Sequence, residues 1–244
     1  MANVSIIIPA LNEAGCLERT LRQLSILNPA AQEIILVDGG SQDQTVAIAE
    51  AAGIQVAHCD WASRSRQMNL GAAQATGDYL CFLHADTLVP DDLVDIIDKT
   101  LAESAIACAG LISLMTGPTQ TRWGISLHNL LKTHYAPLLF RPHLYFYQGL
   151  RLLFGDQAMF CRRQDFLDCG GFNAALPIME EADLCLRLNS YGHIRQVNRT
   201  VRSSDRRVAQ WGSLKAHLTY LKIGLLWGLG VPATQLKPFY PDIR

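Results

Sequence analysis

The chain contains the stretch Ser5-Ile-Ile-Ile-Pro9-Ala-Leu-Asn12-Glu13, in which a short apolar run passes directly into polar side chains. An apolar run of this length, bounded by turn-forming and polar residues, is typical of a buried strand. No basic segment precedes it, and it is too short for the apolar region of a signal peptide. We therefore expect the first strand of a sheet here, and a protein that stays in the cytoplasm.

Four such runs alternate with helical patterns through the first half of the chain, which is typical of a doubly wound α/β sheet with mostly parallel strands. The predicted strands are Val4 to Pro9, Glu33 to Asp38, Gly53 to Cys59 and Asp78 to His84. Four helices are predicted between and after these strands. The first has Leu17, Leu21 and Leu24 on one face, and the second starts at a capping box of Ser41 and Gln44 and runs to Ala52. The third spans Arg64 to Ala75, and the fourth starts at Pro90, with Leu93, Ile97 and Leu101 facing the core.

The second half has a less regular pattern. Strand-like segments are predicted at Ala107 to Leu114 and at Gln157 to Cys161. Between them lies an aromatic-rich stretch from Trp123 to Tyr147, to which the pattern assigns no element.

An amphipathic helix with two apolar faces is predicted in the C-terminal part. One face carries Tyr220, Ile223 and Trp227, and the other carries five leucines, Leu214, Leu218, Leu221, Leu225 and Leu229. Two apolar faces indicate two partners: the domain itself, and either a peripheral membrane contact or a second subunit in a homodimer. A helix buried on both sides is the alternative.

The composition excludes some classes of protein. The 244 residues suffice for one large α/β domain, and 49% are hydrophobic, yet no run of about 18 uncharged apolar residues could span a membrane. A net charge of -1 gives no support for a nucleic-acid partner. The seven cysteines include no Cys-x-x-Cys pair, so we expect small buried side chains, with a reactive cysteine as the alternative.

Polar side chains stand at the ends of three predicted strands. Asn12 and Glu13 follow the first strand, Asp38 ends the second, and His84 and Asp86 follow the fourth. Parallel sheets bind ligands at the carboxyl ends of their strands. These side chains are therefore the first candidates for a functional site.

Seven motifs occur in one order along the chain, and together they resemble family-2 glycosyltransferases with the GT-A fold. They are Ser5-Ile-Ile-Ile-Pro9-Ala-Leu-Asn12-Glu13, Ile35-Leu-Val-Asp38-Gly-Gly-Ser41, Arg66-Gln-Met-Asn69-Leu-Gly71-Ala, Tyr79-Leu-Cys-Phe-Leu-His84-Ala-Asp86, Gly155-Asp156-Gln157, Gly170-Gly171-Phe172 and Met179-Glu180-Glu181-Ala-Asp183-Leu. The resemblance reaches about Arg207 and is closest to a small bacterial subgroup whose acceptors are undefined.

This resemblance implies a GT-A-like, Rossmann-like fold: a mostly parallel sheet flanked by helices, with a C-terminal amphipathic helix. It implies a single domain over residues 1–244, with a nucleotide-sugar-binding half at 1–105, an acceptor and catalytic half at 106–210, and a helix and tail at 211–244. It also implies an inverting reaction.

The resemblance assigns one group of residues to the nucleotide-sugar donor. Pro9, Asn12 and Glu13 are expected to shape the pocket for base and ribose, and Asp38 to accept a hydrogen bond from the nucleobase. The alternative for Asp38 is a carboxylate that caps a loop.

Arg66 is expected by the same resemblance to approach the base from the third helix. Because Asn69 lies three residues further along that helix, both side chains are expected to point into one cleft. The alternative for Asn69 is an amide on the helix surface.

Asp86 resembles the last aspartate of the Asp-x-Asp signature, which holds Mg²⁺ or Mn²⁺ beside the diphosphate. One or two protein carboxylates suffice for such a cation, because water and substrate oxygens fill the other positions. Here His84 replaces the first acid. Three roles are open for His84. It is a metal ligand, in which case Mn²⁺ is favoured over Mg²⁺ because imidazole suits Mn²⁺ better, or it contacts only the ribose, or it is a neutral side chain with a structural role.

The cluster from Glu180 to Asp183 resembles the acidic segment that supplies the catalytic base. Residue matching places that role on Glu181, with Asp183 and Asp156 as further catalytic candidates. Acids grouped at a helix start are expected to raise one another's pKa and bring the base nearer neutrality. Simple capping of the helix is the alternative.

Three arginines near the end of the resemblance, Arg202, Arg206 and Arg207, match basic residues that neutralise the departing nucleoside diphosphate. Guanidinium groups fit phosphate oxygens, and their effect grows as negative charge develops on the leaving group. A solvated basic turn is the alternative.

The predicted function is therefore transfer of a sugar from a nucleotide sugar, most simply a UDP-sugar, to an unknown acceptor hydroxyl, in the cytoplasm or at the inner face of the membrane. A dinucleotide-dependent oxidoreductase does not fit, because no Gly-x-Gly-x-x-Gly follows the first strand. A non-catalytic nucleotide-sugar-binding or membrane-associated partner protein is the remaining alternative.

Overall fold

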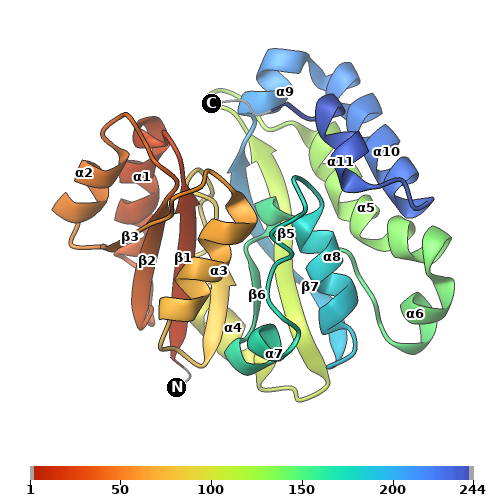
Figure 1. Cartoon of the computed structure of the whole chain (residues 1–244), viewed down its shortest axis with the longest axis horizontal. Coiled ribbons are helices and arrows are strands. Elements are labelled where there is room, and N and C mark those ends of the chain that lie inside the picture. The colour runs from red at the N-terminus through yellow and green to blue at the C-terminus, as the bar shows by residue number, and fades with distance from the viewer. Residues whose placement is uncertain (1–2, 242–244) are drawn as a thin grey trace.

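Seven strands form one sheet in the order β3-β2-β1-β4-β6-β5-β7 (Figure 1). The structure is a computed structural model that describes residues 3–241. Only β6 runs antiparallel to its neighbours, β4 and β5. The strands are β1 Val4–Ala10, β2 Glu33–Asp38, β3 Gln55–His58, β4 Tyr79–Phe82, β5 Ile106–Thr116, β6 Met159–Arg162 and β7 His193–Ser204. The prediction of a mostly parallel sheet is confirmed.

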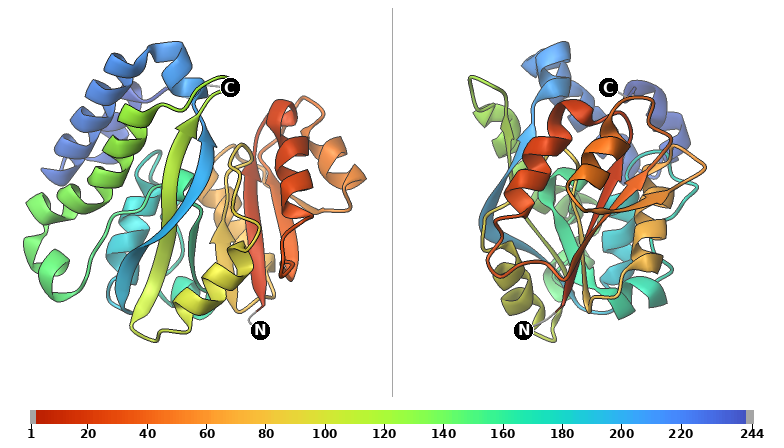
Figure 2. Two further views of the ribbon diagram at one scale, coloured as in Figure 1. Left: turned by 180° about the vertical axis from the view of Figure 1, so that it is seen from behind. Right: turned by 90° about the vertical axis from the view of Figure 1, so that its left-hand side faces the viewer.

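Helices cover both faces of this sheet and add a layer at one side (Figures 1 and 2). They are α1 Ala14–Leu24, α2 Thr45–Ala51, α3 Arg64–Gln74, α4 Leu93–Leu101, α5 Trp123–Phe140, α6 Pro142–Tyr147, α7 Arg163–Asp168, α8 Glu180–Leu188, α9 Arg206–Trp211, α10 Ser213–Gly228 and α11 Ala233–Leu236, with short 3-10 turns η1 at Gly155–Gln157 and η2 at Lys237–Phe239.

The alternation of side chains on β1 divides the core into two parts. Ile6 and Ile8 pack on one side of the sheet, in a cluster that includes residues of α1 and α4. Ile7 packs on the other side, in a cluster that includes residues of α3, α7 and α8. Because successive strand residues point to opposite faces, an unbroken apolar run is what a sheet covered on both sides requires.

The predicted elements of the first half are present, with small differences at their ends. The strands around Val56 and Leu80 are shorter than predicted, whereas Leu93, Ile97 and Leu101 face the core as expected. The predicted capping box of Ser41 is wrong. The Ser41 Oγ accepts a hydrogen bond from the Asn12 N–H at 2.9 Å, and α2 begins only at Thr45, whose N–H donates to Asp43.

Two features of the second half were not predicted. The aromatic-rich stretch forms α5 and α6, and β7 forms the edge of the sheet beside β5. An edge strand keeps many polar and basic side chains, so β7 lacks the apolar run of the central strands. Its buried apolar positions, Ile194 and Val201, are separated by a shift in register with β5.

The predicted C-terminal amphipathic helix is α10, which packs beside α5 (Figure 2). Its inner side buries Ala216 and Ile223, whereas the five leucines of the other side are exposed, with 75% of Leu214 and 59% of Leu218 accessible. The alternative of a helix buried on both sides is therefore wrong for the chain by itself. None of the helices within residues 3–241 combines the length and apolarity that crossing a bilayer demands.

Candidate functional site

A cavity of about 270 Å³ opens where the carboxyl ends of β1 and β4 face η1, α8 and α10. Eight of the residues selected from the sequence line it, from segments far apart in the chain: Pro9, Glu13, His84, Asp86, Asp156, Glu181, Arg206 and Arg207. The rule that parallel sheets bind ligands at their carboxyl edge therefore locates this site. We call this cavity the cleft.

Asp38 and Asn12 lie beside the cleft without lining it. The Asp38 carboxylate is buried and accepts hydrogen bonds from the N–H groups of Gly40 and Ser41 at 3.0 and 3.1 Å, as the loop-capping alternative describes. The Asn12 Oδ1 accepts a hydrogen bond from the Gln42 N–H at 2.8 Å. Both side chains thus fix the loops after β1 and β2.

Neither Asn69 nor Arg66 lines the cleft, although their spacing predicts that both side chains point into one cleft. The Asn69 amide exchanges two hydrogen bonds of 2.8 Å with the backbone of Phe172. Arg66 is exposed, and its guanidinium lies 5.3 Å from the centre of the Trp61 ring. The two residues lie three apart on α3, but the side chain of Asn69 is bound to the backbone of Phe172 and that of Arg66 is exposed.

Asp183 is also held away from the cleft. It forms an ion pair with Arg187 at 2.7 Å, and Arg187 donates to the carbonyl oxygens of Cys169 and Gly171. Asp183 therefore orients Arg187, and Arg187 ties α8 to the Gly170-Gly171 turn.

Glu181 presents a buried carboxylate to the cleft from the first turn of α8. Its Oε1 and the Nε2 of His84 are buried and have no hydrogen-bond partner among residues 3–241. A Cβ added to Gly155 would lie 2.4 Å from each of these two atoms. The two groups therefore border one small space, which is open because residue 155 has no side chain.

Burial changes the protonation of both groups. Burial, and after it the negative charge of Glu180, raise the pKa of Glu181 to about 8, while Arg64 opposes the rise. A higher pKa at this acidic cluster was expected, but burial contributes more than the neighbouring acids. The pKa of His84 falls to about 4, mainly through burial, so its imidazole is neutral at pH 7.

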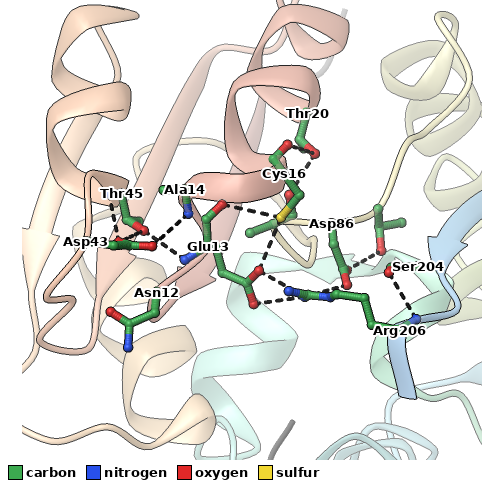
Figure 3. A network of polar contacts seen from close by, with 12 residues as sticks. Asn12, Glu13, Ala14, Cys16, Thr20, Asp43, Thr45, Asp86, Ser204 and Arg206 are labelled. Atoms are coloured by element: carbon green, nitrogen blue, oxygen red, sulfur yellow. Dashed lines mark hydrogen bonds and ion pairs between the residues drawn. The ribbon is translucent and has the colours of Figure 1, made fainter. Parts of the chain in front are cut away.

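On the opposite side of the cleft, Arg206 joins the loops that follow β1 and β4 (Figure 3). Its Nη2 lies 2.9 Å from Glu13 and 2.8 Å from Asp86. Arg207 instead stacks on the Tyr240 ring, with its Cζ 3.8 Å from the ring centre. Arg202 contributes its backbone to a bridge with Leu88 and does not line the cleft.

The thiol of Cys16 points at Glu13, with Sγ 3.1 Å from Oε2 (Figure 3). Burial and the nearby Glu13 carboxylate raise the pKa of Cys16 to about 12. Four other cysteines are fully buried, and burial also raises the pKa of Cys81, Cys108 and Cys161. Thiols that stay protonated are poor nucleophiles, which disfavours the alternative of a reactive cysteine at these positions.

One carboxylate of the cleft, that of Asp86, is of the type that binds a divalent cation together with water and phosphate oxygens. No cluster of three or more potential metal-ligating side chains occurs within residues 3–241. The Asp86 carboxylate nevertheless reaches the cleft, and Arg206 already balances its charge there. A single carboxylate is sufficient where a diphosphate supplies the other oxygens.

Several cleft residues were not selected from the sequence. Arg64 lies 3.4 Å from Glu180, and Lys132 holds its Nζ 3.6 Å from the centre of the Phe154 ring. Burial lowers the pKa of Lys132, while Asp156 and Glu181 oppose that change. Lys132 is the one Lys, Arg, Asp or Glu within α5, a signal that could have marked it.

Comparisons with known proteins give a consistent assignment. The model of "Glycosyl transferase family 2" matches residues 5–171. Pre-mycofactocin glycosyltransferase of Mycobacterium tuberculosis is 26% identical over 202 residues, covering 78% of this chain and 40% of that protein. The PGL/p-HBAD biosynthesis glycosyltransferase of Mycobacterium bovis is 28% identical over 190 residues, covering 75% of this chain and 68% of that protein.

The chain spans less than half the length of the first curated relatives it matches, 21%, 46% and 40% of them. Among solved structures, glucosyl-3-phosphoglycerate synthase from Mycobacterium tuberculosis, in complex with Mn²⁺, UDP and phosphoglyceric acid, aligns with a TM-score of 0.65 and 21% identity. The alignment covers 95% of this chain and 80% of that one, so the two share a fold. With the family model matching most of its length, the chain belongs to glycosyl transferase family 2.

Proposed function

We propose that the chain is a glycosyltransferase that moves a sugar from a UDP-sugar to an acceptor hydroxyl with inversion at the anomeric carbon. The observation that carries this proposal is the buried, unpartnered carboxylate oxygen of Glu181 in the same cavity as Asp86. A base and a diphosphate site facing one space are what a single in-line displacement needs. The relatives named above are glycosyltransferases, and the structural neighbour was solved with UDP.

In the proposed reaction, Glu181 accepts the proton of the acceptor hydroxyl. The hydroxyl oxygen forms a bond to the anomeric carbon as the bond from that carbon to the diphosphate oxygen breaks. Arg206 and Arg207 neutralise the charge that develops on the departing diphosphate. A divalent cation held by Asp86 would supply further positive charge to the diphosphate oxygens.

Neutral His84 is placed to accept or donate one hydrogen bond to the bound substrate through Nε2. A sugar or ribose hydroxyl is a suitable partner, because hydroxyl groups can donate and accept. In the free protein, Arg206 pairs with both Glu13 and Asp86. We infer that donor binding transfers this guanidinium from the two carboxylates to phosphate oxygens.

The pH dependence of activity should follow the charges around Glu181. Because the ionised form of Glu181 is the base, kcat/KM for hydrolysis of UDP-glucose should rise with pH, and the midpoint of this rise should lie near pH 8. Glu180→Gln removes a negative charge and should move this midpoint to lower pH, whereas Arg64→Gln removes a positive charge and should move it to higher pH. Profiles measured from pH 5 to 10 test both shifts, and midpoints unchanged in both variants would exclude Glu181 as the titrating group.

A non-catalytic nucleotide-sugar-binding protein is the competing function. Such a protein would bind a nucleotide sugar in the cleft, but Glu181 would not act as a base. Saturable UDP binding without release of sugar or UDP from any nucleotide sugar would favour it.

A further inference from the structure

A second cavity, of about 300 Å³, lies beside the cleft between α5, α10 and α11. Its wall is mainly apolar and includes Tyr135, Phe140, Leu152, Trp227 and Val231. Nothing in the proposed donor reaction uses it. Apolar cavities of this size next to a catalytic group are suited to the hydrocarbon part of a ligand.

The two cavities meet at a glycine. Lys132, Phe154, Met179 and Gly224 line both of them. A Cβ added to Gly224 would have no atom within 4 Å, so the space beside α10 is open at this position. One turn later on α10 the space is filled, because a Cβ on Gly228 would lie 2.3 Å from the Phe140 ring.

Apart from Arg141, the charged side chains near this junction lie on its cleft side. The amine of the partly buried Lys132 lies against the Phe154 ring and within 3.4 Å of the Asn129 Oδ1, and Glu181 and Asp156 also line the cleft. A molecule that spans the junction would therefore place a polar end near Glu181 and an apolar end against Trp227 and Phe140.

We infer that the acceptor is an amphiphile, whose hydroxyl-bearing head lies at Glu181 and whose hydrocarbon part passes Gly224 into the apolar cavity. This inference rests on the proposed function and defines the class of its acceptor. Burial of several methylene groups gives such a molecule an advantage over a polar analogue with the same head.

Octyl β-D-glucoside and methyl β-D-glucoside are matched probes, since they share a hydroxyl-bearing head and differ only in the chain. Their dissociation constants should be measured below the micellar concentration, with UDP and Mn²⁺ present. We expect the octyl compound to bind wild type at least about tenfold more tightly, because two buried methylenes already suffice for that factor. Equal affinities would overturn the inference.

Gly224→Leu should remove this preference by filling the junction, whereas Gly224→Ala, with its Cβ in open space, should keep most of it. Thermal unfolding checks that both variants fold. A preference for the octyl compound that survives in a folded Gly224→Leu would overturn the inference, and if that variant does not fold, the wild-type comparison decides. Failure of the proposed function is distinguishable, because wild type would then release no UDP from any UDP-sugar.

A different observation concerns the outer surface of α5, α6 and α10, which lie together at one side of the molecule (Figure 1). We call its exposed apolar side chains the leucine face: Leu127, Leu131, Leu139, Phe146, Tyr147, Leu214, Leu218, Leu221, Leu225 and Leu229. An exposed apolar surface of this kind marks an interaction site.

The segments that carry the leucine face contain basic but no acidic side chains. Residues 117–155 and 206–241 contain no Asp or Glu, although the chain has 22 acidic residues. Three basic residues on or between these helices are exposed, Arg141, Lys215 and Lys222, whereas Lys132 and Arg206 line the cleft and Arg122 pairs with Asp205. Apolar side chains flanked by basic ones match a surface of anionic lipid.

The structure thus assigns the leucine face to an anionic bilayer. The protein would lie on the membrane without crossing it, with the apolar cavity and α10 on the membrane side. Attraction to anionic headgroups and burial of the leucines both contribute to such binding, so it should weaken in high salt and in the absence of anionic lipid.

Co-sedimentation with vesicles of phosphatidylcholine, with and without 30% phosphatidylglycerol as a rough working fraction, tests this surface. We expect binding to the anionic vesicles, and at least about a tenfold loss of affinity in Leu218→Gln/Leu225→Gln. Ile26→Gln is the control, because Ile26 is 60% exposed, like Leu218 at 59%, but follows α1. The assignment is overturned if the wild type does not bind the anionic vesicles, or if Ile26→Gln loses as much affinity as Leu218→Gln/Leu225→Gln. It is also overturned if the wild type is a dimer that Leu218→Gln/Leu225→Gln dissociates.

Discussion

Glu181→Gln is expected to lower turnover by about 10²- to 10⁴-fold, the range that loss of a general base produces. The amide keeps the shape of the carboxylate but cannot accept the acceptor's proton. Glu181 is suited to this role because burial raises its pKa to about 8 and leaves Oε1 without a partner. Release of UDP from UDP-glucose, compared between wild type and variant, measures the loss. Retention of wild-type turnover would exclude Glu181 as the base.

A stability measurement shows whether the variant is folded and tests the pKa at the same time. Because the folded pKa lies above the usual value of 4.5, the folded chain binds more protons than the unfolded chain between about pH 4.5 and 8. The contribution of Glu181 to the free energy of unfolding therefore falls as pH rises through this range. We expect Glu181→Gln to unfold at a higher temperature than wild type at pH 8, with the difference disappearing near pH 4.5.

Asp86→Ala is the second change with a large expected effect, about 10²- to 10³-fold in turnover, comparable to loss of one group that stabilises charge in a transition state. The variant loses the carboxylate offered to the cation and one of the two ion-pair partners of Arg206. The rate of UDP release at increasing Mn²⁺ concentration measures both losses, because the variant should respond little to the ion.

Asp168→Ala is a suitable control for this prediction, since Asp168 is exposed on α7, outside the cleft. It should keep the rate and the Mn²⁺ response of wild type. An Asp86→Ala variant with an unchanged Mn²⁺ response would remove Asp86 from the cation site.

The sheet and one side of the cleft could be predicted from the sequence because they depend on local patterns. Apolar runs followed by polar residues gave β1, β2 and β4, and the same junctions gave Glu13 and Asp86. A strand covered on both faces must be apolar throughout, so its end is visible in the sequence.

The rest depends on partners that spacing does not reveal. Asn69 and Asp183 lie in recognisable motifs, yet their side chains bind the Phe172 backbone and Arg187. Lys132 reaches the cleft from an apolar helix without any motif, and β7 was missed because an edge strand is largely polar. Which side chains converge was decided by packing between segments far apart in the chain.

Calorimetric titration of UDP into the wild-type chain and into Asp86→Ala, with and without Mn²⁺, tests whether the cleft binds a nucleoside diphosphate. If the cleft holds a nucleoside diphosphate beside Glu181, wild type will bind one UDP per chain with Mn²⁺, and removal of the ion or of the Asp86 carboxylate will weaken binding at least about tenfold. Absence of saturable UDP binding, or equal binding by Asp86→Ala in the presence of Mn²⁺, would contradict this assignment of the cleft.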